Sequence, residues 1–113
     1  MIKVSIIIPV YHVERYLSQC LDSVIHQTLD DLEIIIVNNG ASLEEINIIK
    51  SYSNECIKII NFENNQGYGK AVNEGLKLAQ GEYVGIVESD DYIEPDMFKI
   101  LYEGAKKYDA DMV

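Results

Sequence analysis

Four short apolar runs constrain the fold of this chain more than any other feature of its sequence. They begin at residues 4, 34, 57 and 83, and the first two are uninterrupted runs that end at Pro9 and at the Asn38-Asn39-Gly40 turn. Continuous rather than alternating apolar runs are typical of parallel strands buried on both faces. We therefore expect a parallel sheet.

Segments with helical periodicity connect these runs. Apolar residues recur at helical spacing over residues 14–27, 69–79 and 95–108, and Ser42 with Glu45 has the form of a capping box at the start of a further helix. The resulting order is β-α-β-α-β-α-β-α with short connections. This order predicts an α/β fold, a Rossmann-like parallel sheet with helices on both faces.

Composition limits the size and the partners of the protein. The 113 residues, 48% hydrophobic and 25% charged, fit a single domain spanning residues 1–113. A net charge of -10 argues against nucleic acid or an anionic membrane surface as a partner. Cys20 and Cys56 lack the spacing of metal ligands and the density of a disulfide framework. We see no signal peptide and no segment of membrane-spanning length, so we expect a cytoplasmic protein without membrane insertion.

Three carboxylates, Glu88, Asp90 and Asp91, follow the fourth apolar run, which is typical of a buried strand. Ligands of open α/β sheets bind at the carboxyl ends of the strands. Because neighbouring carboxylates repel one another, their clustering favours a hard divalent cation bound between them. The alternative interpretation is an acidic turn that caps the next helix.

All four expected strands end in polar or glycine-rich loops, at residues 9–12, 38–41, 64–70 and 88–91. Gathered along one edge of the sheet, these loops favour a concave polar site. Because the net charge of the chain repels anions, a phosphate ligand there would need a metal, helix amino termini or well-placed lysines.

The glycine loop at residues 64–70 does not match the common phosphate-binding motifs. Val72 stands where a dinucleotide fingerprint has its third glycine, and Asn64 and Ala71 stand where a P-loop has glycine and Ser or Thr. What remains is a flexible turn with Lys70 at the start of a helix. That lysine either approaches a nucleotide or is simply solvated.

Six segments occur in a distinctive order and spacing. They are residues 4–11, Glu14 with 16–17, residues 23–28, residues 33–37, Asn65-x-Gly67 through Asn73-x-Gly75, and residues 88–91. Together they resemble the amino-terminal half of family 2 glycosyltransferases, over essentially the whole chain. The resemblance implies the amino-terminal part of a GT-A fold, which binds a nucleotide-sugar and holds a divalent metal on the diphosphate through an Asp-x-Asp type motif.

The resemblance also implies roles for individual residues. Glu88 and Asp90 match the two ends of the Asp-x-Asp motif, with Asp91 as an additional acid, and the implied cofactor is Mg2+ or Mn2+. Such an ion neutralises the charge that develops on a departing diphosphate. The residues implied to bind the nucleotide are Pro9, Tyr11, Glu14, Asn38, Asn39, Asn65, Gly67, Lys70 and Asp90.

The chain departs from the usual family pattern at two places. The family usually has two acids after its second strand, one of which contacts the nucleoside base, whereas this chain has Asn38 and Asn39. An asparagine carbonyl still accepts from a uracil N–H, with less charge assistance, so UDP is the expected nucleotide and other bases stay open. Glu88 replaces the commoner aspartate, which keeps the charge and lengthens the side chain.

The function implied by the resemblance is donor binding by an inverting glycosyltransferase of glycan or polysaccharide synthesis, with a UDP-sugar held through the metal. In this family the acceptor site and the general base lie beyond the position of Val113. We therefore expect a fragment of a longer enzyme that is inactive by itself, whose catalytic residues are unknown, and whose glycan or lipid-linked acceptor binds the missing half. The sheet edge left exposed predicts self-association into a homo-oligomer.

The alternative function is a non-catalytic nucleotide-binding or interaction domain with a decayed transferase site. The amides at Asn38 and Asn39 would then report the loss of nucleotide binding. The carboxylates of Glu88, Asp90 and Asp91 favour the transferase, because a decayed site has no reason to keep three acids together.

Overall fold

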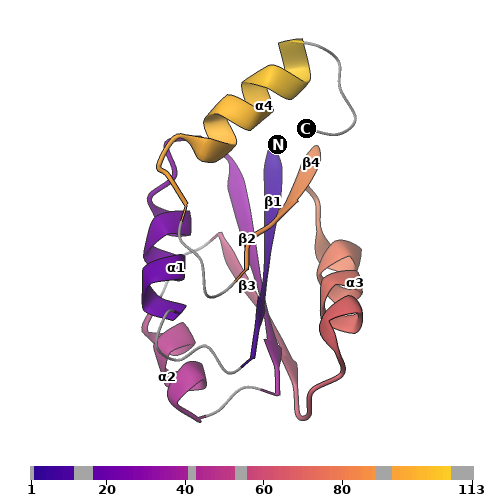
Figure 1. Cartoon of the computed structure of the whole chain (residues 1–113). Coiled ribbons are helices and arrows are strands. Elements are labelled where there is room, and N and C mark those ends of the chain that lie inside the picture. The colour runs from indigo at the N-terminus through magenta and orange to yellow at the C-terminus, as the bar shows by residue number, and fades with distance from the viewer. Residues whose placement is uncertain (1, 12–16, 41–42, 53–55, 89–92, 108–113) are drawn as a thin grey trace.

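The structure, a computed structural model, describes residues 2–11, 17–40, 43–52, 56–88 and 93–107. Strands and helices alternate along the chain, as Figure 1 shows, so the predicted order is confirmed. The elements are β1 (Val4–Val10), α1 (Leu17–Ile25), β2 (Leu32–Asn39), α2 (Leu43–Ser51), β3 (Ile57–Phe62), α3 (Tyr68–Leu78), β4 (Tyr83–Ile86) and α4 (Met97–Lys107).

The four strands form one parallel sheet in the order β3-β2-β1-β4. Strand β1 pairs on one side with β2, where Val4 lies opposite Leu32, and on the other side with β4, where Val4 lies opposite Tyr83. Every residue of β1 is buried, as expected for a central strand that is covered on both faces. The prediction of a parallel α/β sheet is confirmed.

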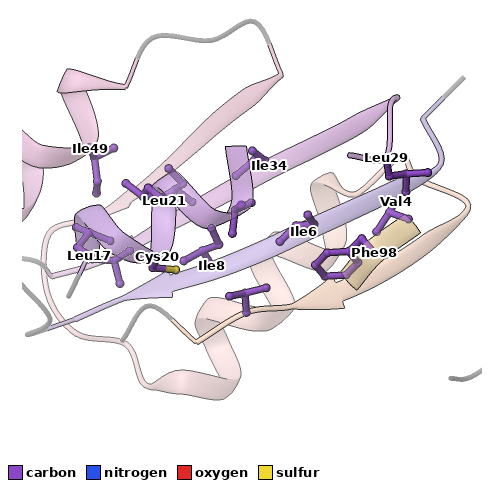
Figure 2. Packing of buried hydrophobic residues seen from close by; sticks show 14 residues of the cluster. Val4, Ile6, Ile8, Leu17, Cys20, Leu21, Leu29, Ile34, Ile49 and Phe98 are labelled. Atoms are coloured by element: carbon purple, nitrogen blue, oxygen red, sulfur yellow. The ribbon is translucent and has the colours of Figure 1, made fainter. Parts of the chain in front are cut away.

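Helices cover both faces of this sheet, also as predicted (Figure 1). On one face, Ile6 and Ile8 of β1 pack in a cluster with side chains of α1, α2 and α4. Figure 2 shows Leu17 and Leu21 of α1 lying over that face. On the other face, Ile7 packs in a second, smaller cluster beneath α3. Alternation of side chains along β1 thus supplies both cores.

Strand β1 continues through Pro9 to Val10, beyond the end that we predicted from the proline. Pairing between β1 and β4 reaches only Ile7 and Ile86, although the C=O of Ile7 still accepts the next N–H of the chain beyond β4. Alternate residues of a strand face the same neighbour, so Pro9 faces the side on which the β4 ladder has already ended. Its missing N–H therefore costs no ladder hydrogen bond.

Strand β4 is an edge strand, so the prediction of a buried strand is wrong for this element. Its side chains alternate between partly buried and exposed, with Val84 and Ile86 on the exposed face. Gly85 is required on the other face, because a Cβ there would lie 2.4 Å from the Phe98 ring of α4. A cavity of about 530 Å³ opens between β4 and α4, near the amino end of the sheet.

Helix α4 begins at Met97, two residues after the proline that we expected in its first turn. Pro95 lies in the turn just before the helix, where its C=O accepts the N–H of Thr28. Among the described residues, no helix is both long enough and apolar enough to cross a membrane.

Candidate functional site

The carboxyl ends of the strands lie along one edge of the sheet, which we call the carboxyl rim. Val10 at the end of β1 lies opposite Asn38 of β2, and Asn38 lies opposite Asn61 of β3. Strand β4 brings Glu88 to the same edge. The predicted clustering of the loops that follow the strands is therefore confirmed for the residues that the structure describes.

Asn39, the last residue of β2, binds the glycine loop through both ends of its amide. Its Oδ1 accepts the N–H of Gln66 at 2.8 Å, and its Nδ2 donates to the C=O of Gly67 at 3.3 Å. The side chain is buried, with 4% of the residue exposed. A carboxylate in its place would accept the first bond but could not donate the second. The amide therefore suits this loop better than the acid that the family usually has here.

Gly40 lets the same loop approach the end of β2 closely. Its φ of 73° lies in the left-handed region, and a Cβ on it would lie 2.5 Å from the Asn65 nitrogen and 2.8 Å from the Asn64 carbonyl carbon. Within the loop, Oδ1 of Asn65 accepts the N–H of Gly67 at 2.8 Å, and Gly67 has a φ of 90°. The glycine loop is therefore preorganised rather than loosely held.

Asn38 is also turned toward the protein. It is 4% exposed, and its Nδ2 donates to Oδ1 of Asn61 on the neighbouring strand at 3.1 Å. Each of the two amides that replace the family's acids thus has a structural contact. Their predicted contact with a nucleoside base stays a prediction.

Glu88 is held from three directions at the rim. Its C=O accepts a weak hydrogen bond from the thiol of Cys20 in α1 at 3.5 Å, and the preceding residue, Val87, donates its N–H to the C=O of Ile7. Its carboxylate accepts the hydroxyl of Tyr68, the first residue of α3, at 2.7 Å. This hydrogen bond raises the pKa of Tyr68, and burial and the charge of Glu88 act in the same direction.

The amino terminus of α3 opens onto the loop without a side-chain cap. Gly67 occupies the N-cap position and makes no capping hydrogen bond through a side chain. The N–H groups of the first helical turn are therefore available for an anion at this end of the helix. Lys70 pairs with Glu74 one turn further along the helix, at 3.6 Å, and its predicted contact with the nucleotide stays a prediction.

The remaining predicted residues divide into two groups. Pro9 is buried in β1, one residue before the strand ends, and Tyr11 directly follows the strand with 40% of the residue exposed. Glu14, Asp90 and Asp91 lie outside the described residues.

Of the three carboxylates in the predicted metal site, the structure describes one, Glu88. It is exposed, supplies oxygen donors suited to a hard cation, and pairs with no lysine or arginine in the described part of the chain. A cluster of three or more His, Cys, Asp or Glu side chains is absent from that part. The donor that is described fits Mg2+ or Mn2+, and the further ligands remain a sequence prediction.

Sequence reasoning missed the residues that organise the rim rather than line it. The sequence places Tyr68 in the glycine loop without indicating a role for its hydroxyl. Gln66 contributes a backbone N–H, and Cys20 contributes a packed thiol. The position of Tyr68, an aromatic residue between two glycines at the start of a helix, was the one available signal. Nothing in the sequence indicated the contacts of the other two residues.

Comparison with known proteins gives consistent results. The family model described as glycosyl transferase family 2 matches residues 5–113. Glycosyltransferase GlyA of Streptococcus pneumoniae is 42% identical over 97% of the chain, and the uncharacterized glycosyltransferase EpsJ of Bacillus subtilis is 40% identical over the same share. The chain spans 16% of the length of the first relative and 32% of the second.

Solved structures share the same architecture. TarS of S. aureus, in a 1–349 form crystallised with UDP-GlcNAc, is 31% identical over 96% of the chain with a TM-score of 0.89. The chain covers 32% of that structure.

Proposed function

Because this chain belongs to glycosyl transferase family 2, we propose that it binds the nucleotide-sugar donor of a glycosyltransferase at the carboxyl rim. The observation that carries this proposal is the juxtaposition of the preorganised glycine loop with Glu88, bridged by Tyr68. A fixed loop and a bound cation together suit a nucleoside diphosphate, and the glycine loop adjoins Glu88, the proposed cation ligand.

A diphosphate ligand at the rim needs favourable local charges or hydrogen-bond donors. The chain carries a net charge of -10, which repels anions at long range. The uncapped first turn of α3 offers N–H donors and the positive end of the helix dipole. Lys70 is paired with Glu74, so we assign it a smaller role than those N–H groups.

We propose that Glu88 and Asp90, with Asp91 nearby, hold Mg2+ or Mn2+. When bound, this ion would neutralise the charge that develops on the diphosphate. Glu88 would be a ligand through its free oxygen, directly or through a water, because the bond from Tyr68 occupies only one lone pair.

UDP is the proposed nucleotide, supported by the UDP-GlcNAc complex of the S. aureus relative. Inverting transfer to a glycan or lipid-linked acceptor is the proposed reaction of the enzyme to which these residues contribute. One relative, from Bacillus spizizenii and 36% identical, is named as a poly(ribitol-phosphate) beta-glucosyltransferase, in keeping with a polymer acceptor. A cytoplasmic location and self-association also stay predictions.

Calorimetric titration of UDP into the 113-residue chain, with Mn2+ and then with EDTA, tests the proposal. We expect UDP binding that weakens by more than about tenfold when EDTA removes Mn2+, and by a similar factor in Asp90→Ala with Mn2+ present. Glu103→Ala, an exposed acid on α4, serves as the matched control and should bind like the parent chain. If the folded chain binds none of the nucleoside diphosphates with Mn2+, the alternative of a non-catalytic domain replaces this proposal.

A further inference from the structure

Tyr68 makes a side-chain contact that neither the motif pattern nor the comparisons assign. More than half of the residue, 52%, is exposed, yet its hydroxyl lies 2.7 Å from Oε1 of Glu88. An exposed tyrosine gains little from such a contact in stability, because both groups could be solvated instead. A contact of this kind beside a predicted metal ligand therefore points to function.

The backbone of Tyr68 is fixed on both sides. Before it, the C=O of Gly67 accepts the amide of Asn39, and the N–H of Gly67 donates to Asn65. After it, α3 lies so close to β1 that a Cβ on Gly75 would come within 2.8 Å of the Ile7 side chain. This close packing on the core, to which Ala71 also contributes, sets where α3 lies and where the Tyr68 side chain begins.

The backbone of Glu88 is fixed as well, by Cys20 and by the hydrogen bond from Val87 to Ile7. With both backbones set, the hydroxyl–carboxylate bond determines where the Glu88 side chain points. No described lysine or arginine competes for this carboxylate.

We propose that Tyr68 is a positioning residue that holds the Glu88 carboxylate ready for a divalent cation and links it to the glycine loop. The inference rests on the proposed donor site and deepens it. A single hydroxyl donor leaves the second carboxylate oxygen free for the cation. Carboxylates that ligate metals are commonly oriented by hydrogen bonds of this sort, and their loss weakens metal binding. The loop that receives the diphosphate and the acid that receives the metal then form one unit.

Tyr68→Phe tests this proposal, because it removes only the hydroxyl. The first probe is Mn2+ alone, with free Mn2+ measured by electron paramagnetic resonance, and the second is UDP by calorimetry with Mn2+ or EDTA. We expect about tenfold weaker Mn2+ binding and an equal loss in Mn2+-dependent UDP affinity. UDP affinity in EDTA should change by less than about twofold. A general loosening of the glycine loop would instead weaken UDP binding in EDTA as well.

Tyr102→Phe is the matched control. The hydroxyl of Tyr102 donates to the exposed Glu82 at 3.0 Å, and as with Tyr68 and Glu88 the two residues are 20 positions apart. This pair lies at the other end of the sheet. Its loss should leave Mn2+ and UDP binding unchanged, and thermal unfolding of both variants should stay close to that of the parent chain.

A double-mutant cycle with Glu88→Gln completes the test. Positioning predicts that Tyr68→Phe has no further effect on Mn2+ binding once Glu88 has lost its charge. An unchanged or tighter Mn2+ affinity in Tyr68→Phe, or an equal loss in both backgrounds, overturns the inference. If Mn2+ binding depends on Tyr68 but UDP does not bind, the inference stands and the donor function falls. If the parent chain binds no Mn2+, both fall.

Discussion

The two ends of the sheet use a glutamate in opposite ways. At the amino end, Glu33 of β2 is 2% exposed and accepts hydrogen bonds from Ser5, from the Gln80 N–H and from Lys58, with which it also forms an ion pair. At the carboxyl rim, the exposed Glu88 accepts one side-chain bond from the described residues, that of Tyr68. Both oxygens of the first carboxylate have described partners, whereas one oxygen of the second has none among the described residues.

This difference indicates that the amino end of the sheet contributes to stability and that the carboxyl rim is suited to binding. The Glu33 network joins β1, β2, β3 and the turn before β4, and Gly81 completes it by donating its N–H to Ser5 Oγ at 2.8 Å. Among the described residues, no buried side-chain polar atom lacks a hydrogen bond. The buried polar groups at the amino end are therefore satisfied within the protein, whereas the carboxyl rim carries an acid that the described residues satisfy only in part.

Removal of the two carboxylates should give the largest contrast. We expect Glu33→Ala to lower the free energy of unfolding by about 2–3 kcal/mol, because it leaves several buried or half-buried donors without their acceptor. Glu88→Ala should cost less than about 0.5 kcal/mol. Urea denaturation followed by circular dichroism measures both. Equal losses of unfolding free energy in Glu33→Ala and Glu88→Ala would show that the two carboxylates contribute alike to stability, against this interpretation.

An exchange of amide for acid at the rim should give an intermediate effect. Asn39→Asp keeps the bond from Gln66 but loses the donor to the C=O of Gly67, so we expect a loss of about 1 kcal/mol. The new carboxyl group should have a raised pKa, so its penalty relative to the parent should shrink as the pH falls and it becomes a donor again.

Urea denaturation of the parent chain and of Asn39→Asp at several pH values in the acid range would measure how this stability penalty changes with pH. A gain in stability at neutral pH would contradict the interpretation that the amide is fitted to the loop.

The smallest expected effect is the acid sensitivity that Glu33 gives to the parent chain. Burial alone would raise the pKa of Glu33, but the hydrogen bonds from Lys58, Ser5 and the Gln80 N–H outweigh it, so the pKa is lowered from the ordinary 4.5. Because the folded-state pKa is lowered, the carboxylate contributes stability above pH 4.5 that is lost as the pH falls through the folded value.

Glu33→Gln removes this titration and should flatten the stability profile below pH 4.5, at a lower overall stability. Thermal unfolding at closely spaced pH values would measure the two profiles. Parallel profiles for the parent and the variant would assign the acid sensitivity to other carboxylates.

The sequence predicted what periodicity encodes and missed what depends on neighbours in space. The runs at Val4 and Ile34 led to the parallel sheet because strands buried on both faces are continuously apolar. The same rule failed for β4, where Val84 and Ile86 are apolar yet exposed, since sequence alone does not tell which strand lies at an edge.

The site divides in the same way. The position of Glu88 at the rim could be predicted because the residue follows a strand closely, and such positions gather at one edge of a parallel sheet. The double contact of Asn39 could not, because Gln66 and Gly67 lie far along the chain and contribute only backbone groups. The motif pattern predicts that Asn39 contacts the nucleoside base, whereas the described hydrogen-bond partners of its side chain belong to the glycine loop.

The strand order has a consequence for how the protein is made. Strand β1 leaves the ribosome before the other three described strands, yet one of its two neighbours is β4, the last of the four, with Val4 opposite Tyr83. At about 5–20 residues per second, translation leaves one hydrogen-bonding edge of that nascent, strongly apolar strand open for several seconds. Such distant pairing is slow to form and exposed to misassembly, so chaperone demand during synthesis should exceed what the small size of the chain suggests.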